Sequence, residues 1–397
     1  MKTNNNTYHV LIAGLILLCF TTCVEEYVPQ TETFEDILVI EANITDELKS
    51  HVIKLSRTFR FENEGGALGE RNAEVKINDS EGSEYLFQET DLGVYTSVLP
   101  FQALSDREYT LSIQTNDGKS YISDSVKLTQ KTSIDKLYAE RMTNDDGLEG
   151  VGIFVDSFDT TGNASFYRYE FEETFRFVAP EFNDFDLILL SDDPLIVDFV
   201  RRPLEKRVCY KTNSTLDILI TKTEDFDENR VSKFLVRFIG IDDYAISDRY
   251  SILTHQFVQS RETYEFYQTL KEFSNSASLF SQIQPGFIVG NIKSLSNEKE
   301  NVLGLFQVSS ISSKRIFFNY RDFFPKEDLP PYFEDCTISA PLIRPSFPST
   351  IRTGLFLFAG NNADPNFGQG GPYKLVAKAC GDCTEIGSSE IPEFWKN

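Results

Sequence analysis

The side chains that most often carry catalysis are few in this chain, and they form no recognisable catalytic pattern. Outside the amino-terminal leader the only histidines are His51, in an alternating strand pattern, and His255, just before a predicted helix. We interpret both as structural. The sequence has no Gly-x-Ser-x-Gly, His-Glu-x-x-His or Gly-x-x-x-x-Gly-Lys motif. With 61 acidic residues no carboxylate pair stands out, and we expect no enzyme activity, catalytic residue or cofactor.

Four of the six cysteines are expected to form disulfides. Cys19 lies in the leader and Cys23 follows it, which leaves Cys209, Cys336, Cys380 and Cys383. An even number of cysteines in an exported chain favours disulfides. We favour the pairs Cys209–Cys336 and Cys380–Cys383, because the second pair can close a short local loop. Cys380 and Cys383 could instead form a redox pair or half of a zinc site, but the βαβ setting and two further ligands are missing from the pattern.

Two other segments could bind a ligand. Residues 156–163 (Asp-Ser-Phe-Asp-Thr-Thr-Gly-Asn) are an oxygen-rich turn that could hold calcium, although it lacks the EF-hand spacing. We interpret it as a plain turn and expect no metal. Residues 165–178 alternate aromatic and charged side chains, which predicts a strand with one buried and one solvent-exposed face. We interpret the aromatic face as core, with a sugar-stacking platform as the alternative.

The amino terminus has the pattern of an export signal with a lipid attachment site. Lys2 precedes an apolar run at residues 10–20, which is shorter than the about 20 residues that span a membrane. Thr22 and Cys23 follow, as in a lipobox, where the signal is cleaved and the cysteine is acylated. The alternative is an ordinary signal peptide with an incidental cysteine. Glu25 and Glu26 resemble a surface-export signal, and we expect an outer-membrane lipoprotein facing the cell exterior.

Composition limits the possible partners. The formal net charge is −23, and hydrophobic residues make up 41% of the 397 residues. So acidic a chain argues against nucleic acid as a partner, because the phosphate backbone is bound by basic patches. So apolar and aromatic a chain is expected to fold rather than remain disordered.

Short strands dominate the predicted elements. Strand patterns at residues 37–44, 73–77 and 109–113, with turns between them, predict an Ig-like or transthyretin-like β-sandwich over residues 35–132. A larger β-rich domain with one or two helices is predicted for residues 133–397. Its strands include residues 303–308, and its clearest helix follows Ser260 as a possible N-cap. Residues 1–22 are the predicted signal peptide and 23–34 an acidic tether.

A series of motifs, in this order, resembles one known family. The resemblance is to the Bacteroidota outer-membrane lipoproteins classed as domain-of-unknown-function family 4249. The motifs lie at residues 23–27, 38–41, 55–58, 166–170, 290–292, 380–384 and 392–395.

This resemblance implies a role but no site. Members of the family tend to be associated with TonB-dependent transporters, and no catalytic or ligand residue can be carried over. We therefore expect a non-catalytic binding or accessory subunit beside such a transporter. The alternative is an adhesive or structural surface protein without a transporter. A hydrolase with an acid-built site is a weaker third hypothesis.

Overall fold

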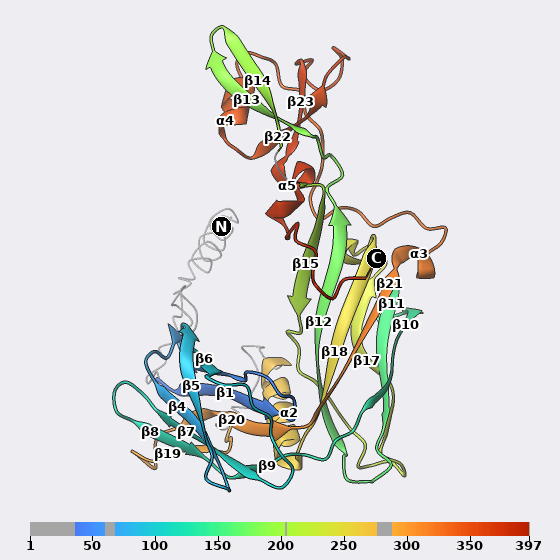
Figure 1. Cartoon of the computed structure of the whole chain (residues 1–397). Helices are drawn as coiled ribbons and strands as arrows, with labels where there is room; N and C mark the ends of the chain where they lie inside the picture. The colour runs from blue at the N-terminus through green and yellow to red at the C-terminus, as the bar shows by residue number, and fades with distance from the viewer. Residues whose placement is uncertain (1–35, 60–67, 203–204, 276–287, 397) are drawn as a thin grey trace, which may run out of the picture.

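The computed structural model describes residues 36–59, 68–202, 205–275 and 288–396 (Figure 1). Strands account for 48% and helices for 10% of the residues, which confirms the predicted mainly β class. The predicted signal peptide, Cys23 and the tether lie outside the described residues.

The amino-terminal strands form one mixed sheet that curls until it is nearly closed, and we call it the curled sheet. Alternate side chains point inward, as Leu38, Ile40, Val75 and Ile77 do, and all four are buried. The strand order is β19-β8-β7-β4-β5-β6-β2-β1-β20, with β3 beside β2 and β9 beside β7. The strands are β1 (Leu38–Thr45), β2 (Val52–Arg57), β3 (Leu68–Gly69), β4 (Glu74–Asp79), β5 (Glu84–Asp91), β6 (Val94–Ser97), β7 (Glu108–Gln114), β8 (Ser120–Ser123), β9 (Val126–Lys127), β19 (Ile292–Ser294) and β20 (Val302–Ser309).

Two strands of the curled sheet come from far along the chain, which corrects the predicted boundary at residues 132 and 133. β20 runs parallel to β1, with Leu38 opposite Val302 and Thr45 opposite Ser309. β19 pairs antiparallel with β8. The apolar pattern at residues 303–308 predicts a strand but not its partner, and the predicted place of this strand in the larger β-rich domain is wrong. The prediction of a two-sheet sandwich for this region is also wrong, because its strands form one continuous path of paired neighbours.

A side-chain amide joins the two ends of the curled sheet. Asn291 Nδ2 donates to the carbonyl oxygen of Phe306 at 2.8 Å, and the Phe306 amide donates to Asn291 Oδ1 at 2.8 Å. Asn291 thus imitates one residue of a neighbouring strand. Gly290 allows this approach, because a Cβ atom there would lie 1.6 Å from the carbonyl oxygen of Gly304.

Two antiparallel sheets pack face to face in the second module, which we call the sandwich. Tyr169 of one sheet stacks on Phe234 of the other, with ring centroids 4.8 Å apart. The strand orders are β10-β11-β17 and β15-β12-β18-β21, with β16 beside β12. The strands are β10 (Ile134–Thr143), β11 (Glu149–Phe158), β12 (Phe166–Val178), β15 (Val208–Ser214), β16 (Leu219–Lys222), β17 (Arg230–Gly240), β18 (Arg249–Val258) and β21 (Ile311–Asn319), with the short helices η1 (Tyr244–Ile246) and α3 (Tyr320–Phe323).

The aromatic face of β12 forms the sandwich core. Tyr167, Tyr169, Phe175 and Phe177 are each at most 2% exposed, as the core interpretation predicts. Glu173 lies on the same face and is also buried. Its carboxylate accepts hydrogen bonds from Arg237 Nε at 2.8 Å, Asn213 Nδ2 at 3.1 Å and Tyr250 Oη at 2.5 Å. These partners balance the cost of burying the charge.

A third, smaller part projects from the far end of the sandwich, and we call it the tip (Figure 1). Its own small core contains Leu187, Phe347, Phe358 and Leu375. Its elements are β13 (Phe185–Asp192), β14 (Leu195–Arg201), α4 (Phe347–Arg352), β22 (Phe356–Asn361), β23 (Tyr373–Ala377), α5 (Lys378–Gly381) and η2 (Cys383–Glu385).

The predicted helix is α2 (Arg261–Asn275). Ser260 Oγ accepts the backbone amide of Thr263 at 3.2 Å, which is the bond expected of the predicted N-cap. In Figure 1, α2 stands between the curled sheet and the long strands of the sandwich.

Candidate functional site

A groove of about 610 Å³ lies between the curled sheet and the sandwich. The outer face of β1 and β20 forms its floor, and α2 lines one wall with Phe266, Tyr267 and Leu270. Arg168 and Glu170 of β12 and residues 215–219 complete the lining. We call this hollow the intermodule groove.

The floor results from strand alternation. In β1, Leu38, Ile40, Ala42 and Ile44 point into the curled sheet, so the residues between them, including Asn43, point outward. The parallel register places Asn43 directly opposite Gln307. Gln307 is 4% exposed, and its Nε2 donates to Tyr267 Oη of α2 at 2.6 Å. Gln307 Oε1 and Asn43 Oδ1 are buried without a hydrogen-bond partner, which is costly unless a ligand supplies one.

Arg168 is the residue that the sequence interpretation missed. It lies on the predicted solvent-exposed face of β12, yet it is 7% exposed. Its guanidinium lies 4.6 Å from the ring centroid of Phe257 and 4.8 Å from that of Tyr267, and it pairs with the Glu170 carboxylate. Its Nε has no hydrogen-bond partner. Helix α2 covers this part of β12, and periodicity within β12 carries no information about that cover.

A second hollow of about 290 Å³ adjoins the intermodule groove, and Glu170 and Thr215 line both. His255 lies here, and its Nδ1 is 2.7 Å from Ser313 Oγ. Burial lowers the pKa of His255, although Glu172 and Glu170 act in the opposite direction. His255 is therefore neutral at pH 7. Basic and acidic side chains nearly balance in the two hollows, which contain Lys49, Lys54, Arg168, Glu41, Glu170, Glu172 and Asp217.

The disulfide pairing differs from the expected one. Cys209 bonds to Cys383 and Cys336 bonds to Cys380, so the favoured pairs Cys209–Cys336 and Cys380–Cys383 are wrong. Cys380 lies in α5 and Cys383 begins η2. The two thiols lie on successive helical turns and point to different segments. They therefore do not bond to each other, although the loop between them is short. The Cys209–Cys383 bond joins the sandwich to the tip, and the Cys336–Cys380 bond joins α5 of the tip to the segment between α3 and α4.

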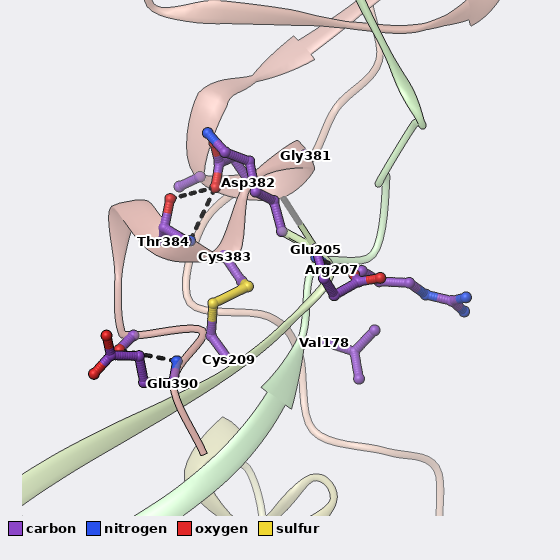
Figure 2. The surroundings of a disulfide bond; sticks show 12 residues. Val178, Glu205, Arg207, Cys209, Gly381, Asp382, Cys383, Thr384 and Glu390 are labelled. Carbon is purple, nitrogen blue, oxygen red and sulfur yellow. Dashed lines mark hydrogen bonds and ion pairs between the residues drawn. A yellow bond between two sulfur atoms is a disulfide. The ribbon is translucent and has the colours of Figure 1, made fainter. Parts of the chain in front are cut away.

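Figure 2 shows the Cys209–Cys383 disulfide, which joins β15 of the sandwich to η2. The neighbouring Asp382 accepts the Thr384 amide at 3.0 Å and the Thr384 hydroxyl at 2.5 Å. Asp382 also pairs with Lys206 at 2.6 Å. Burial opposes ionisation of Asp382, but these contacts lower its pKa. The turn is thus held by both covalent and ionic contacts.

The carboxylates of the turn at residues 156–163 accept hydrogen bonds from backbone amides of the turn and of a neighbouring segment. Asp159 accepts the amides of Thr161, Asn163 and Ala164 at 2.7–3.0 Å. Burial alone would raise the pKa of Asp159, but these hydrogen bonds lower it. Asp156 Oδ1 accepts the amide of Lys233 at 2.6 Å. Within the described residues, no group of three or more His, Cys, Asp or Glu side chains could hold a metal ion.

His51 lies in the curled sheet, where it is 2% exposed. One ring nitrogen is 2.9 Å from the carbonyl oxygen of Phe101, and the ring lies 4.6 Å from the Phe101 ring. Burial lowers its pKa to about 4. These contacts agree with the structural interpretation of His51.

One family model matches most of the chain. The family is described as "Domain of unknown function (DUF4249)", and the match covers residues 24–315. It therefore includes the curled sheet, the groove-lining residues and most of the sandwich. No curated protein matches the chain. Among the described residues, no helix has the length and apolar character needed to cross a membrane.

Proposed function

The chain belongs to the DUF4249 family, and on that basis we propose that it is a surface lipoprotein that works by binding. In this proposal Cys23 carries the lipid, the protein faces the exterior of the outer membrane of a Bacteroidota cell, and it serves as a non-catalytic accessory subunit beside a TonB-dependent transporter.

The intermodule groove is the observation that carries the binding role. It is open, it contains three buried polar atoms without hydrogen-bond partners, and its lining comes from both modules and from α2. Since buried polar groups in proteins are nearly always paired, such a site is most stable with an occupant. A groove formed at a module interface is also where ligand sites commonly occur.

Sequence supports the anchoring role. The apolar run at residues 10–20 ends just before Thr22 and Cys23. One acyl chain holds a protein only marginally, whereas the several chains of a bacterial lipoprotein would hold it stably. β1 begins at Leu38, soon after Cys23, so the curled sheet would be the membrane-proximal docking module. The tip would be the part farthest from the membrane.

Purification from native membranes tests this proposal. The tagged full-length protein would be extracted in mild detergent and its partners identified by mass spectrometry. We expect one TonB-dependent transporter in near-stoichiometric amount. Repeated recovery of the intact lipoprotein without any transporter would overturn the accessory role.

One observation favours the adhesive alternative. The outer face of the β13–β14 hairpin exposes Ile188, Leu190, Ile196 and Val200, which are 43–62% exposed. Exposed apolar clusters often mark protein contacts. If the double variant Leu190→Asp and Ile196→Asp abolished attachment of cells to one another or to a surface, adhesion would replace transport assistance as the preferred function.

A further inference from the structure

We infer that the intermodule groove binds an extended polypeptide segment with aliphatic side chains, contributed by a partner protein. This inference rests on the proposed binding role, and it names the site and the chemical class of the occupant.

The unpaired polar atoms match a peptide backbone. Gln307 Oε1 and Asn43 Oδ1 are acceptors that need donors, and Arg168 Nε–H is a donor that needs an acceptor. A peptide backbone offers N–H and C=O groups in regular alternation, so one short segment would supply both once the side chains of these groove-lining residues rotate, because the three unpaired atoms are themselves buried. Each such hydrogen bond removes the cost of leaving a buried polar group unpaired, which is about 1–3 kcal/mol.

The lining favours aliphatic side chains over sugar rings. Leu216 is 98% exposed and Val52 is 43% exposed, and both line the groove. A glycan site would present flat aromatic faces for stacking. Of the aromatic residues that line the groove, Tyr169 stacks on Phe234 in the sandwich core and Tyr267 has Arg168 against its face, which leaves Phe266. The other aliphatic lining residues include Val39, Ile218, Leu270, Leu303 and Leu305.

Charge and shape agree with a neutral, chain-like occupant. Three basic and four acidic side chains line the two adjoining hollows, although the whole chain has a formal net charge of −23. The groove is therefore far less acidic than the rest of the surface and does not select a strongly charged ligand. Glu170 and Thr215 line both hollows, so the two hollows adjoin each other beside β12.

The test measures binding of defined peptides. Full-length protein in detergent micelles is screened against a library of acetylated, amidated nonapeptides, with maltoheptaose and cellohexaose in a parallel arm. We expect selection of peptides with aliphatic residues and no binding of either sugar. Leu216→Arg places a long cation in the groove mouth and should weaken peptide binding at least tenfold. Leu99→Arg, at a 74% exposed leucine outside the groove, is the matched control.

A second variant tests the polar match. Asn43→Leu removes an acceptor that has no hydrogen-bond partner and leaves the Gln307–Tyr267 hydrogen bond in place, so we expect about tenfold weaker binding with an unfolding midpoint close to that of the wild type. Binding of the sugars in place of peptides, or peptide binding that Leu216→Arg and Leu99→Arg weaken equally, would overturn the inference. The absence of binding by the wild type to every library member would do the same.

The two proposals fail separately. If a transporter co-purifies with the full-length protein but no library peptide binds, the accessory role stands and the groove inference falls. If peptides bind in the groove but no transporter is recovered, the groove inference stands and the accessory role falls.

Discussion

Burial of His51 makes the stability of the curled sheet depend on pH. Its pKa is lowered from 6.5 to about 4 by burial, so the folded state favours the neutral ring. As the pH falls below 6.5, the unfolded chain binds this proton first, and stability is lost progressively down to about pH 4. Between pH 7 and pH 5, this one group should lower the free energy of unfolding by about 2 kcal/mol.

Urea unfolding of the wild type and of His51→Gln at pH 7 and pH 5 measures the contribution of His51 to the free energy of unfolding. Glutamine can still donate to the Phe101 carbonyl, and the contributions of the carboxylates are common to both proteins. The stability difference between pH 7 and pH 5 should shrink by about 2 kcal/mol in the variant. An unchanged difference would show that His51 is not buried as a neutral ring.

Arg168 shows why single residues of the groove could not be predicted. The alternation of residues 165–178 correctly assigns Tyr167 and Phe175 to the core. The same alternation assigns Arg168 to solvent, because strand periodicity describes one strand and not the helix that crosses it. Gln307 is hidden in the same way, since Tyr267 of α2 covers it. Only the docking of α2 makes these two residues a site.

Closure of the curled sheet depends on Gly290 and Asn291. In Gly290→Ala the new Cβ would collide with the Gly304 carbonyl oxygen, so we expect a loss of about 3 kcal/mol in the free energy of unfolding. Gly82→Ala is the matched control, because Gly82 has a φ of +86° and open space around its Cβ position. Gly82→Ala should lower the free energy of unfolding by only about 1–2 kcal/mol, which is the cost of a left-handed conformation for a residue other than glycine.

Urea titration of both variants provides the comparison. Equal losses for the two substitutions would contradict a close contact between the ends of the sheet.

Peptide mapping tests the disulfide pairing directly. A protease that cuts before aspartate separates Cys380 from Cys383, because Asp382 lies between them. Under non-reducing conditions the Cys383 fragment should be joined to the Cys209 fragment, and the Cys380 fragment to the Cys336 fragment. Finding the Cys380 and Cys383 fragments joined to each other would contradict the structure.

The elements were more predictable than their partners. The strands β1 and β12 and the helix α2 could be predicted, because residues close in sequence determine the strand alternation, the helical spacing and the capping serine. The parallel pairing of β1 with β20 brings residues 38 and 302 together, and no local pattern records it. The same limit applies to the cysteines, because four thiols allow three pairings and the fold alone selects one.

Membrane attachment of the whole molecule should depend on one thiol. Cys23→Ala removes the proposed acylation site, so the protein should leave the envelope fraction and enter the soluble fraction after cell fractionation. Metabolic labelling with a radioactive fatty acid should label the wild type and not the variant. A variant that still takes up the labelled fatty acid would contradict the anchor.

Site-specific photo-crosslinking in living cells tests the central claim most directly. A photoreactive amino acid would replace Leu216 at the groove mouth or, as a control, Leu99 outside the groove. The account predicts that position 216 crosslinks to one TonB-dependent transporter, through a segment rich in aliphatic residues, and that position 99 does not. Identical crosslinking patterns from the two positions, or no crosslinked protein at position 216, would contradict it.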